Sequence, residues 1–425
     1  MNTRLIFRNI KLIDCKSELN NKRVNVKVDQ NKAWIVPSDE IQVGFEEHDA
    51  GSMILTQGFT DLYCHIPDPG FEYRENFESA SRLALASGYT TLCCLPDSDP
   101  VVDTKSQVHY ILQQNELFPV TFLPVGALTQ KLQGKSMADL FDMHTHGAVA
   151  FSDANHPVMD VGLLKRSLQY VSGFGGVVFT YALDPQFNEG GLIHEGLQSL
   201  LLGLKGLPPQ SEYLMIQRNI EVLDYVGGRL HISKVSCAES VALIRAAKQR
   251  GLAITADVAV LNLLATDTDL DSFSSHYKVL PPLRDTEHQL ALIEGIKDGT
   301  IDAICSDHRP LNPELKQVEF NNAAFGASTL QSAWVKLLEK WEHTLGSNLI
   351  ASCLSYGPQK VLQIEPKPLT LGEIRNFVIT QLQKPWTLTP QNNASLSANS
   401  PFMHTRHAHQ IVATHTSKEI YFNNL

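Results

Sequence analysis

The sequence predicts an α/β protein that consists of a TIM-type (β/α)8 barrel and a small β-domain. From about Met53 to Gln363, short apolar segments alternate with amphipathic segments whose apolar residues lie three and four positions apart. At both ends of the chain the pattern has period two and is broken by Asn, Asp and Gly, which is typical of short paired strands. We therefore expect residues 53–363 to form the barrel, and residues 1–52 and 364–425 to form one small β-domain.

The barrel strands are expected where short apolar runs follow amphipathic helices. The mostly apolar run Met53–Phe59 is expected to be the first of them and to end at the barrel mouth. Because TIM barrels carry their sites at the C-terminal ends of the strands, chemistry is expected directly after each run. The remaining strands are expected at Thr91–Leu95, Val120–Val125, Ala148–Phe151, Val177–Phe179, Arg229–Val235, Ala253–Ala256 and Ala303–Cys305, with helices that include Asn76–Ser87, Ser240–Gln249 and Glu287–Lys297.

The small β-domain is expected from strand-like segments at both ends of the chain. The polar stretch Asn392–Ser400 within this region is expected to be a surface loop. The strands are expected around Leu5–Phe7, Ile10–Ile13, Val24–Val28, Ala33–Val36, Phe377–Ile379, Gln410–Ala413 and Glu419–Tyr421.

Composition and charge exclude several classes of function. The formal net charge is −10 and no basic cluster is present, which argues against nucleic acids and anionic membranes as partners. No apolar run approaches the roughly 18 residues that span a bilayer. The seven cysteines show no CxxC spacing, as expected for free thiols in a reducing compartment. We expect a cytoplasmic protein.

Several motifs, in one order along the chain, carry a family resemblance. The first is Asp61–Gly70, which reads Asp-Leu-Tyr-Cys-His-Ile-Pro-Asp-Pro-Gly. The others are Gly88–Thr91 followed by Leu95–Asp97, Ala150–Asp153, His231–Ser236, Pro281–Arg284, Ser306–His308 and Asn399–Phe402. With these motifs the chain resembles the dihydroorotases, a family of cyclic amidohydrolases whose first motif is Asp-x-His-x-His-x-Arg-x-Pro-Gly. The resemblance implies a barrel of the amidohydrolase kind.

The resemblance also implies where a binuclear zinc centre would lie, and most of its ligands are replaced. The two histidines of the first motif fall on Tyr63 and His65, and the general-base aspartate falls on Asp307. Only His65 and Asp307 keep a metal-binding side chain; the other ligand positions fall on Ala154, Tyr181 and Lys234, with Asp153 one residue from Ala154. The substrate-binding Arg and Asn of the family fall on Pro67 and Asp97.

The replacements remove the chemistry that the family requires. A protonated Lys234 has no lone pair, Ala154 has no donor atom, and tyrosine phenols with a pKa near about 10 rarely bind metal at neutral pH. Without a metal no water is acidified for Asp307 to deprotonate. We therefore expect no catalytic residue, no residue that binds metal or substrate, and no cofactor. We expect Lys234 to pair with Asp307 or Asp97. A catalytic Lys234, or one zinc ion held by His65 and Asp307, is the alternative.

Other histidines and cysteines have simpler interpretations. His144 and His146 precede a predicted strand, which is the wrong end for a barrel site, so we expect them in a surface turn. His404, His407 and His409 are expected to be exposed to solvent. Cys64 and Cys305 flank the site and are expected to serve in packing.

The resemblance implies a function for a barrel that has lost its site. Catalytically silent dihydroorotase-like subunits accompany bacterial aspartate carbamoyltransferase in pyrimidine biosynthesis, so the implied partner is that enzyme's catalytic chain, in an oligomer. One alternative is an active dihydroorotase, which would need zinc. The other is a small-molecule sensor that uses the emptied pocket. Zinc content separates the active enzyme from the other two, and ligand-dependent melting shifts separate a sensor from a scaffold.

Overall fold

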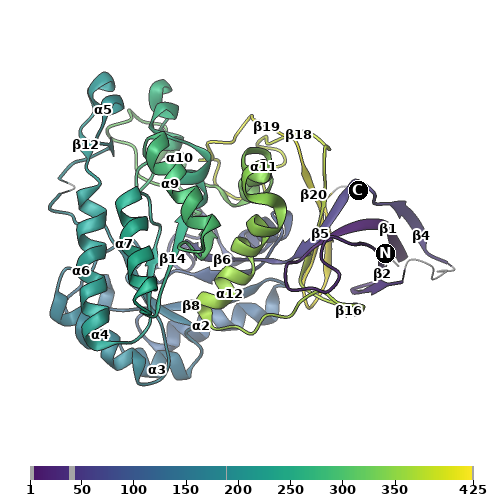
Figure 1. Cartoon of the computed structure of the whole chain (residues 1–425), viewed down its shortest axis with the longest axis horizontal. Helices are drawn as coiled ribbons and strands as arrows, with labels where there is room; N and C mark the ends of the chain where they lie inside the picture. Colours follow the sequence, from purple (N-terminus) through teal and green to yellow (C-terminus); the bar gives the residue numbers. More distant parts are fainter. Residues whose placement is uncertain (1–3, 38–43, 188, 424–425) are drawn as a thin grey trace.

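The computed structural model describes residues 4–37, 44–187 and 189–423, and it shows a barrel joined to a twisted sheet (Figure 1). Eight parallel strands pair in the order β15-β14-β13-β10-β9-β8-β7-β6, and a parallel bridge between Cys64 and His308 brings the two edges together. The predicted barrel is therefore confirmed. Its strands are β6 (Phe59–Cys64), β7 (Tyr89–Cys94), β8 (Thr121–Ala127), β9 (Ala150–Ser152), β10 (Val178–Tyr181), β13 (Leu230–Ser233), β14 (Ile254–Ala259) and β15 (Ala303–Cys305).

Amphipathic helices cover the outside of the barrel. Helix α1 begins with a capping box, in which the Asn76 side chain accepts from the Ser79 amide, and it buries Phe77 and Leu83 against the strands. The main helices are α1 (Phe77–Ala86), α2 (Lys105–Leu117), α3 (Leu140–Thr145), α4 (Val161–Ser172), α6 (Gln210–Val226), α7 (Ala238–Gln249), α9 (Thr286–Lys297), α11 (Ala333–Leu354) and α12 (Tyr356–Leu362). Shorter elements are α5 (Leu197–Leu202), α8 (Val260–Leu264), α10 (Pro313–Lys316), η1 (Gln130–Leu132), η2 (Asp267–Ser272), η3 (Ser275–Tyr277) and η4 (Leu330–Ser332).

Strands from both ends of the chain form one nine-stranded sheet beside the barrel (Figure 1). Strands near the N-terminus supply Phe7, Leu12 and Val26 to its core, and strands near the C-terminus supply Ile379 and Val412. The strands are β1 (Arg4–Ile13), β2 (Arg23–Asp29), β3 (Lys32–Val36), β4 (Glu46–Asp49), β5 (Met53–Gln57), β16 (Gly372–Ile374), β17 (Phe377–Gln381), β20 (Gln410–His415) and β21 (Ile420–Phe422). Two small pairs, β11 (Ile193–His194) with β12 (Gly206–Leu207) and β18 (Trp386–Thr387) with β19 (Arg406–His407), complete the strands.

The expected first barrel strand, Met53–Phe59, is divided between the two sheets. Its first part, β5, pairs with β1 and β17 in the nine-stranded sheet, and the barrel begins only at Phe59. Gly58 separates the two parts, and a Cβ there would lie 2.4 Å from Cγ2 of Thr90. The tight crossing between sheets therefore requires glycine, and hydrophobicity alone did not reveal it.

The polar stretch Asn392–Ser400 is not the surface loop that its composition predicted. Ser395, Ser397, Asn399 and Ser400 are buried, and the segment packs on the loops at the barrel mouth. The Asn399 side chain, for example, donates to the Arg309 carbonyl at 3.0 Å. Polar side chains are buried here because they satisfy main-chain groups of the barrel loops. We call residues 392–400 the C-terminal strap.

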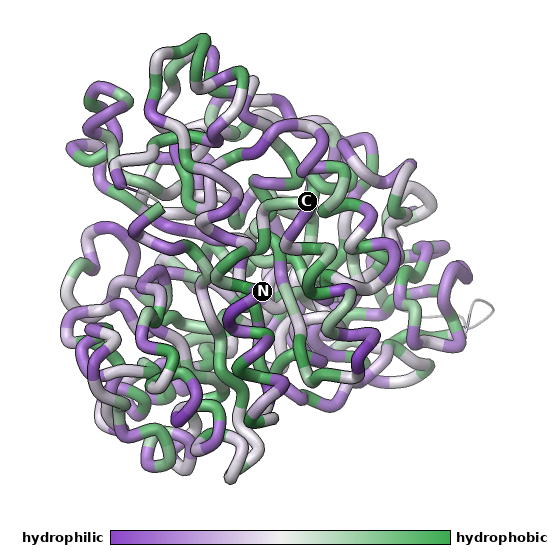
Figure 2. The backbone as a smooth tube through the Cα atoms, turned by 60° about the vertical axis from the view of Figure 1, so that its left-hand side comes forward, coloured by the Kyte–Doolittle hydropathy of each residue, from purple (hydrophilic) through white to green (hydrophobic). Residues whose placement is uncertain are grey.

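Apolar and polar segments alternate along the whole trace (Figure 2). Among the described residues, no helix has both the length and the apolar character needed to cross a membrane.

Candidate functional site

Residues from five strand ends converge at the C-terminal mouth of the barrel. Tyr63 is the penultimate residue of β6 and Tyr181 is the last residue of β10, while Ala154, Lys234 and Asp307 follow β9, β13 and β15 closely. These last three residues have positive φ angles of 51°, 58° and 48°. Such backbone is uncommon for residues with a side chain and is often found at functional sites. The fold thus brings together the positions that the sequence singled out.

The ammonium group of Lys234 lies at the centre of this site. Its Nζ donates to Asp307 Oδ1 at 2.8 Å, Asn155 Oδ1 at 2.7 Å and the Leu280 carbonyl at 3.0 Å, so all three donors are used. It also lies 4.5 Å from the ring centroid of Tyr63 and 4.8 Å from that of Tyr181. Lys234 is 1% exposed. The predicted pairing with Asp307 is confirmed, whereas Asp97 has another partner.

Asn155 is a central residue of the site that the sequence did not reveal. Besides Lys234, its Oδ1 accepts from the Tyr63 hydroxyl at 3.1 Å, and its Nδ2 donates to His65 Nε2 at 3.5 Å. Asp153 points elsewhere, because its carboxylate accepts from the amide and hydroxyl of Thr129. Burial raises the pKa of Asp153 to about 6. Of the two neighbours of Ala154, it is therefore Asn155 that enters the site with an amide, and Asp153 does not supply a carboxylate there.

His65 forms a second polar pair with Asp97. Since Nε2 of His65 accepts from Asn155, Nδ1 carries the proton and donates to Asp97 Oδ2 at 2.7 Å. Burial lowers the pKa of His65, against the opposing effect of Asp97. Burial by itself would raise the pKa of Asp97, but His65 and then Arg309 bring it below its ordinary value. Arg309, which follows the Ser306–His308 motif, is a further charged residue near this pair, and its place was not predicted from the sequence.

The two tyrosines contribute neutral phenols. Burial raises the pKa of Tyr63 and of Tyr181 well above the ordinary value, and the Asp307 charge adds to the effect. Tyr63 donates to Asn155, whereas the Tyr181 hydroxyl has no hydrogen-bond partner among the described residues. Both rings therefore line the ammonium of Lys234 without offering it a negative charge.

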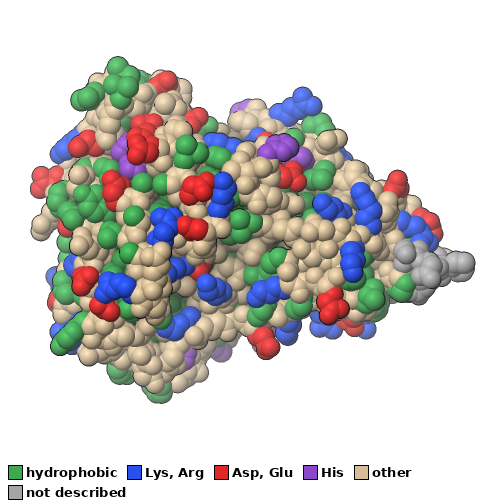
Figure 3. Space-filling view, in the orientation of Figure 1, with side chains coloured by type: hydrophobic (Ala, Val, Ile, Leu, Met, Phe, Trp, Pro, Cys, Tyr) green, Lys and Arg blue, Asp and Glu red, His purple; other side chains and the backbone are tan. Residues whose placement is uncertain are grey.

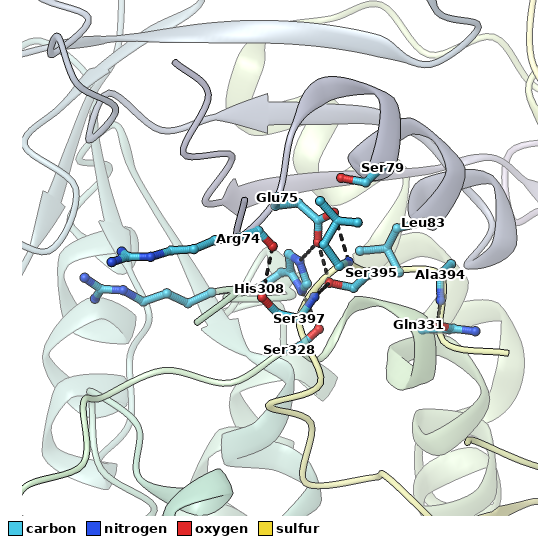
Figure 4. A network of polar contacts seen from close by, with 12 residues as sticks. Arg74, Glu75, Ser79, Leu83, His308, Ser328, Gln331, Ala394, Ser395 and Ser397 are labelled. Atoms are coloured by element: carbon cyan, nitrogen blue, oxygen red, sulfur yellow. Dashed lines mark hydrogen bonds and ion pairs between the residues drawn. The ribbon is translucent and has the colours of Figure 1, made fainter. Parts of the chain in front are cut away.

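A buried polar network supports the strand end that carries Asp307 (Figure 4). His308 Nε2 lies 3.4 Å from Oε2 of Glu75, and its Nδ1 lies 3.3 Å from the Ser328 hydroxyl. Glu75, which is fully buried, also accepts from the hydroxyl of Ser395 and from the Leu396 amide. The network fastens the C-terminal strap to the residue next to Asp307.

A second set of buried bonds holds the chain around Lys234. The Asp257 carboxylate accepts from the Lys234 amide at 2.6 Å and lies 3.0 Å from His231 Nε2. His231 is fully buried and also contacts the Thr255 hydroxyl at 2.9 Å, so its ring is held against β14. The ends of β13 and β14 are therefore held by residues that do not occupy the family's metal-ligand positions.

The remaining histidines lie away from this site. His144 lies in α3, not in the expected surface turn, and the exposed His146 directly follows this helix; both precede β9, at the opposite end of the barrel. His404 is exposed, but His407 is buried, contrary to expectation: its Nε2 lies 2.8 Å from the Ser332 hydroxyl and its ring stacks on Trp386. Burial lowers the pKa of His407 to about 4. Stacking and this hydrogen bond explain why a His-rich segment can be partly internal.

One group of residues with metal-ligand side chains occurs among the described residues outside the barrel centre. It consists of His194, Asp285 and His288, whose ligand atoms lie within 4.8 Å of one another. However, Nδ1 of His194 accepts from Arg284 at 3.1 Å, and Nδ1 of His288 accepts from the Ala238 amide at 3.1 Å. Each neutral ring therefore carries its proton on Nε2, which leaves no free lone pair for a metal.

Comparisons with known proteins agree with the geometry. The family model described as "Dihydro-orotase-like" matches residues 51–240. A "Dihydroorotase" of Caldicellulosiruptor saccharolyticus is 39% identical over 360 residues, covering 84% of this chain and 83% of that protein. A "Dihydroorotase" of Syntrophotalea carbinolica is 34% identical over 403 residues, covering 94% of each chain.

Among solved structures, the L-hydantoinase (dihydropyrimidinase) from Arthrobacter aurescens superposes with a TM-score of 0.82 at 23% identity. The match covers 97% of this chain and 94% of that chain, and it supports the amidohydrolase barrel fold. Together with the sequence relatives, these findings show that the chain belongs to the dihydroorotase-like family.

Proposed function

We propose that this chain is a catalytically silent member of the dihydroorotase-like family, in which a lysine replaces the metal centre. The observation that carries the proposal is the Lys234 ammonium, 2.8 Å from Asp307 and bonded to three acceptors. A buried carboxylate needs a compensating cation, and here the protein supplies it.

The residues present do not fit a binuclear zinc centre. Zinc takes lone pairs from His, Cys or carboxylate groups, with at least three protein ligands for each ion, and only His65 and Asp307 of the six positions offer them. A zinc ion about 4 Å from the Lys234 ammonium would be repelled by about 8 kcal/mol at an effective dielectric constant near 20. This repulsion makes zinc binding unfavourable.

The substrate side of the site is altered as well. Pro67 has no group that binds a carboxylate, and the carboxylate of Asp97 is held by His65. Asp307, the only general-base candidate that the resemblance supplied, is bonded to Lys234. We therefore expect purified protein to show no turnover of dihydroorotate or carbamoyl-aspartate.

The second candidate is an active dihydroorotase with an unusual site. It is favoured by the relatives, which bear that name at 34% and 39% identity. Identity summed over hundreds of residues is dominated by the fold, whereas activity depends on a few side chains. An assay for ring opening decides between the two: turnover that is abolished by Asp307→Ala supports the active enzyme, and no turnover above a buffer control supports the silent protein.

We further propose that the protein serves as an assembly subunit for the aspartate carbamoyltransferase catalytic chain, in the cytoplasm. The seven cysteines are all unpaired, as expected in a reducing compartment. Helix α5 carries three strongly exposed leucines, Leu197, Leu200 and Leu201, at 73%, 80% and 69% exposure. Hydrophobic side chains are visible at the upper left of the space-filling view, where α5 lies (Figure 3). Contiguous apolar surface of this kind is typical of protein-binding sites.

Co-expression of the two chains tests the assembly role. A scaffold should co-elute with the carbamoyltransferase chain in size-exclusion chromatography, and Asp307→Ala should leave that complex intact. Independent migration at micromolar concentration would contradict the role. A sensor would then be the remaining candidate, and it would show a ligand-dependent rise in melting temperature that requires residues of the barrel mouth.

A further inference from the structure

A separate cavity lies beside the barrel mouth, between α10, η3 and the C-terminal strap. Its volume is about 370 Å³, within the range of small-molecule sites. Leu311, Pro401 and Met403 supply apolar wall, and His276, Lys316 and His404 supply basic groups. Of the residues that the structure describes, no Asp or Glu lines it.

Lys316 has an incomplete set of partners. The residue is 2% exposed, and its Nζ donates to the carbonyls of Ala324 and Gly326, each at 2.9 Å. The ammonium has three hydrogens, so one of them has no acceptor among the described residues. Within the same part of the chain, no carboxylate forms an ion pair with Lys316.

More positive charge surrounds Lys316. Lys278 is also buried, and its Nζ donates to the carbonyls of Phe320 and Asn321 at 2.7 and 3.0 Å. The same ammonium lies 5.2 and 4.8 Å from the ring centroids of Phe320 and Phe325. Burial, followed by the charges of Lys278 and Arg309, lowers the pKa of Lys316 to about 7. The Nδ1 atom of His276, in the cavity wall, is buried without a hydrogen-bond partner. Among the described residues, no carboxylate forms an ion pair with either lysine.

We propose that this cavity binds a small organic anion, a monocarboxylate with an apolar body. The carboxylate pairs with the free N–H of Lys316, and the apolar body packs on Leu311 and Met403. A purely structural role, in which Lys316 holds the loop carbonyls of Ala324 and Gly326, would account for its two hydrogen bonds. It does not account for the third donor of Lys316, or for a cavity wall that contains no acidic side chain among the described residues. This site is distinct from the barrel centre and does not depend on the proposed function.

The test uses calorimetric titration of the full chain with benzoate and with benzamide, its neutral analogue of similar shape. A charge-assisted contact is worth roughly 1.5–3 kcal/mol, so benzoate should bind at one site per chain at least about tenfold more tightly than benzamide. Equal binding of the two probes, or no saturable binding of benzoate, would overturn the proposal. Inorganic phosphate serves as a third probe that has the charge but no apolar body, and it should bind more weakly than benzoate.

Two variants locate the binding. Lys316→Met should abolish benzoate binding, and unchanged binding would overturn the proposal. If that variant does not fold, Ala398→Trp decides, because Ala398 lines the cavity and is exposed. Ala408→Trp is the matched control, since Ala408 is exposed on the same C-terminal segment but does not line the cavity. Binding that survives Ala398→Trp would place the anion elsewhere and refute the proposal.

Discussion

The ion pair between Lys234 and Asp307 should behave as a buried, strongly coupled unit. The Lys234 side chain is fully buried and that of Asp307 is only 10% exposed. If one partner is removed, water can therefore do little to solvate the charge of the other. Removing one member of a buried pair typically costs about 3–5 kcal/mol, because the other charge is left without a partner. We therefore expect Lys234→Met to lower the free energy of unfolding by about 3 kcal/mol.

The double variant separates this explanation from a simple packing defect. Apolar pairs often replace buried ion pairs at little cost, so Lys234→Met with Asp307→Leu should be more stable than the sum of the two single variants predicts, by about 2 kcal/mol or more. The assay is urea unfolding followed by circular dichroism, with equal m values required in all four proteins. A Lys234→Met cost below about 1 kcal/mol, or single costs that add to within about 0.5 kcal/mol, would refute the reasoning.

Three further predictions concern other residues. Asn155→Ala should lower stability by about 1–3 kcal/mol in the same urea assay, because a buried ammonium loses an acceptor; an unchanged midpoint would contradict this. Burial raises the pKa of Asp61 from 3.8 to about 6, so its contribution to stability is present below pH about 4 and is lost as the pH rises through 6. Wild-type stability should fall relative to Asp61→Asn over that window by up to about 3 kcal/mol, and parallel pH profiles would disprove the shift. Replacing Leu200 and Leu201 by serine should weaken co-elution with the carbamoyltransferase chain, whereas Leu117→Ser, at 72% exposure on α2, should not; equal effects would exclude α5 as the binding surface.

The barrel could be predicted because apolar residues recur with a different period in its strands than in its helices. The strand expected at Ala303–Cys305 is found with the same limits, and the helix expected at Glu287–Lys297 begins one residue earlier. The run Met53–Phe59 could not be divided from the sequence, since both of its parts are apolar and buried. Which sheet each part joins depends on the crossing at Gly58, which is a tertiary feature.

The site was predictable only where motifs mark it. The motifs identified Tyr63, Lys234 and Asp307, and all three meet at the barrel mouth. Asn155 and Arg309 lie next to motif residues but were missed, because nothing in their type or spacing shows that they face the site. The same limit applies to the C-terminal strap. Ser395 bonds to the Glu75 carboxylate and Ser397 bonds to the Arg74 carbonyl, and these partners are near only in the folded chain.

Zinc content tests the central claim most directly. Protein purified from zinc-supplemented medium and desalted should contain far less than one zinc ion per chain by elemental mass spectrometry, because Lys234 occupies the space next to Asp307. A His194→Ala variant measured alongside shows whether any trace metal comes from the cluster outside the barrel centre. One or two zinc ions per chain, lost in Asp307→Ala and retained in His194→Ala, would contradict the account.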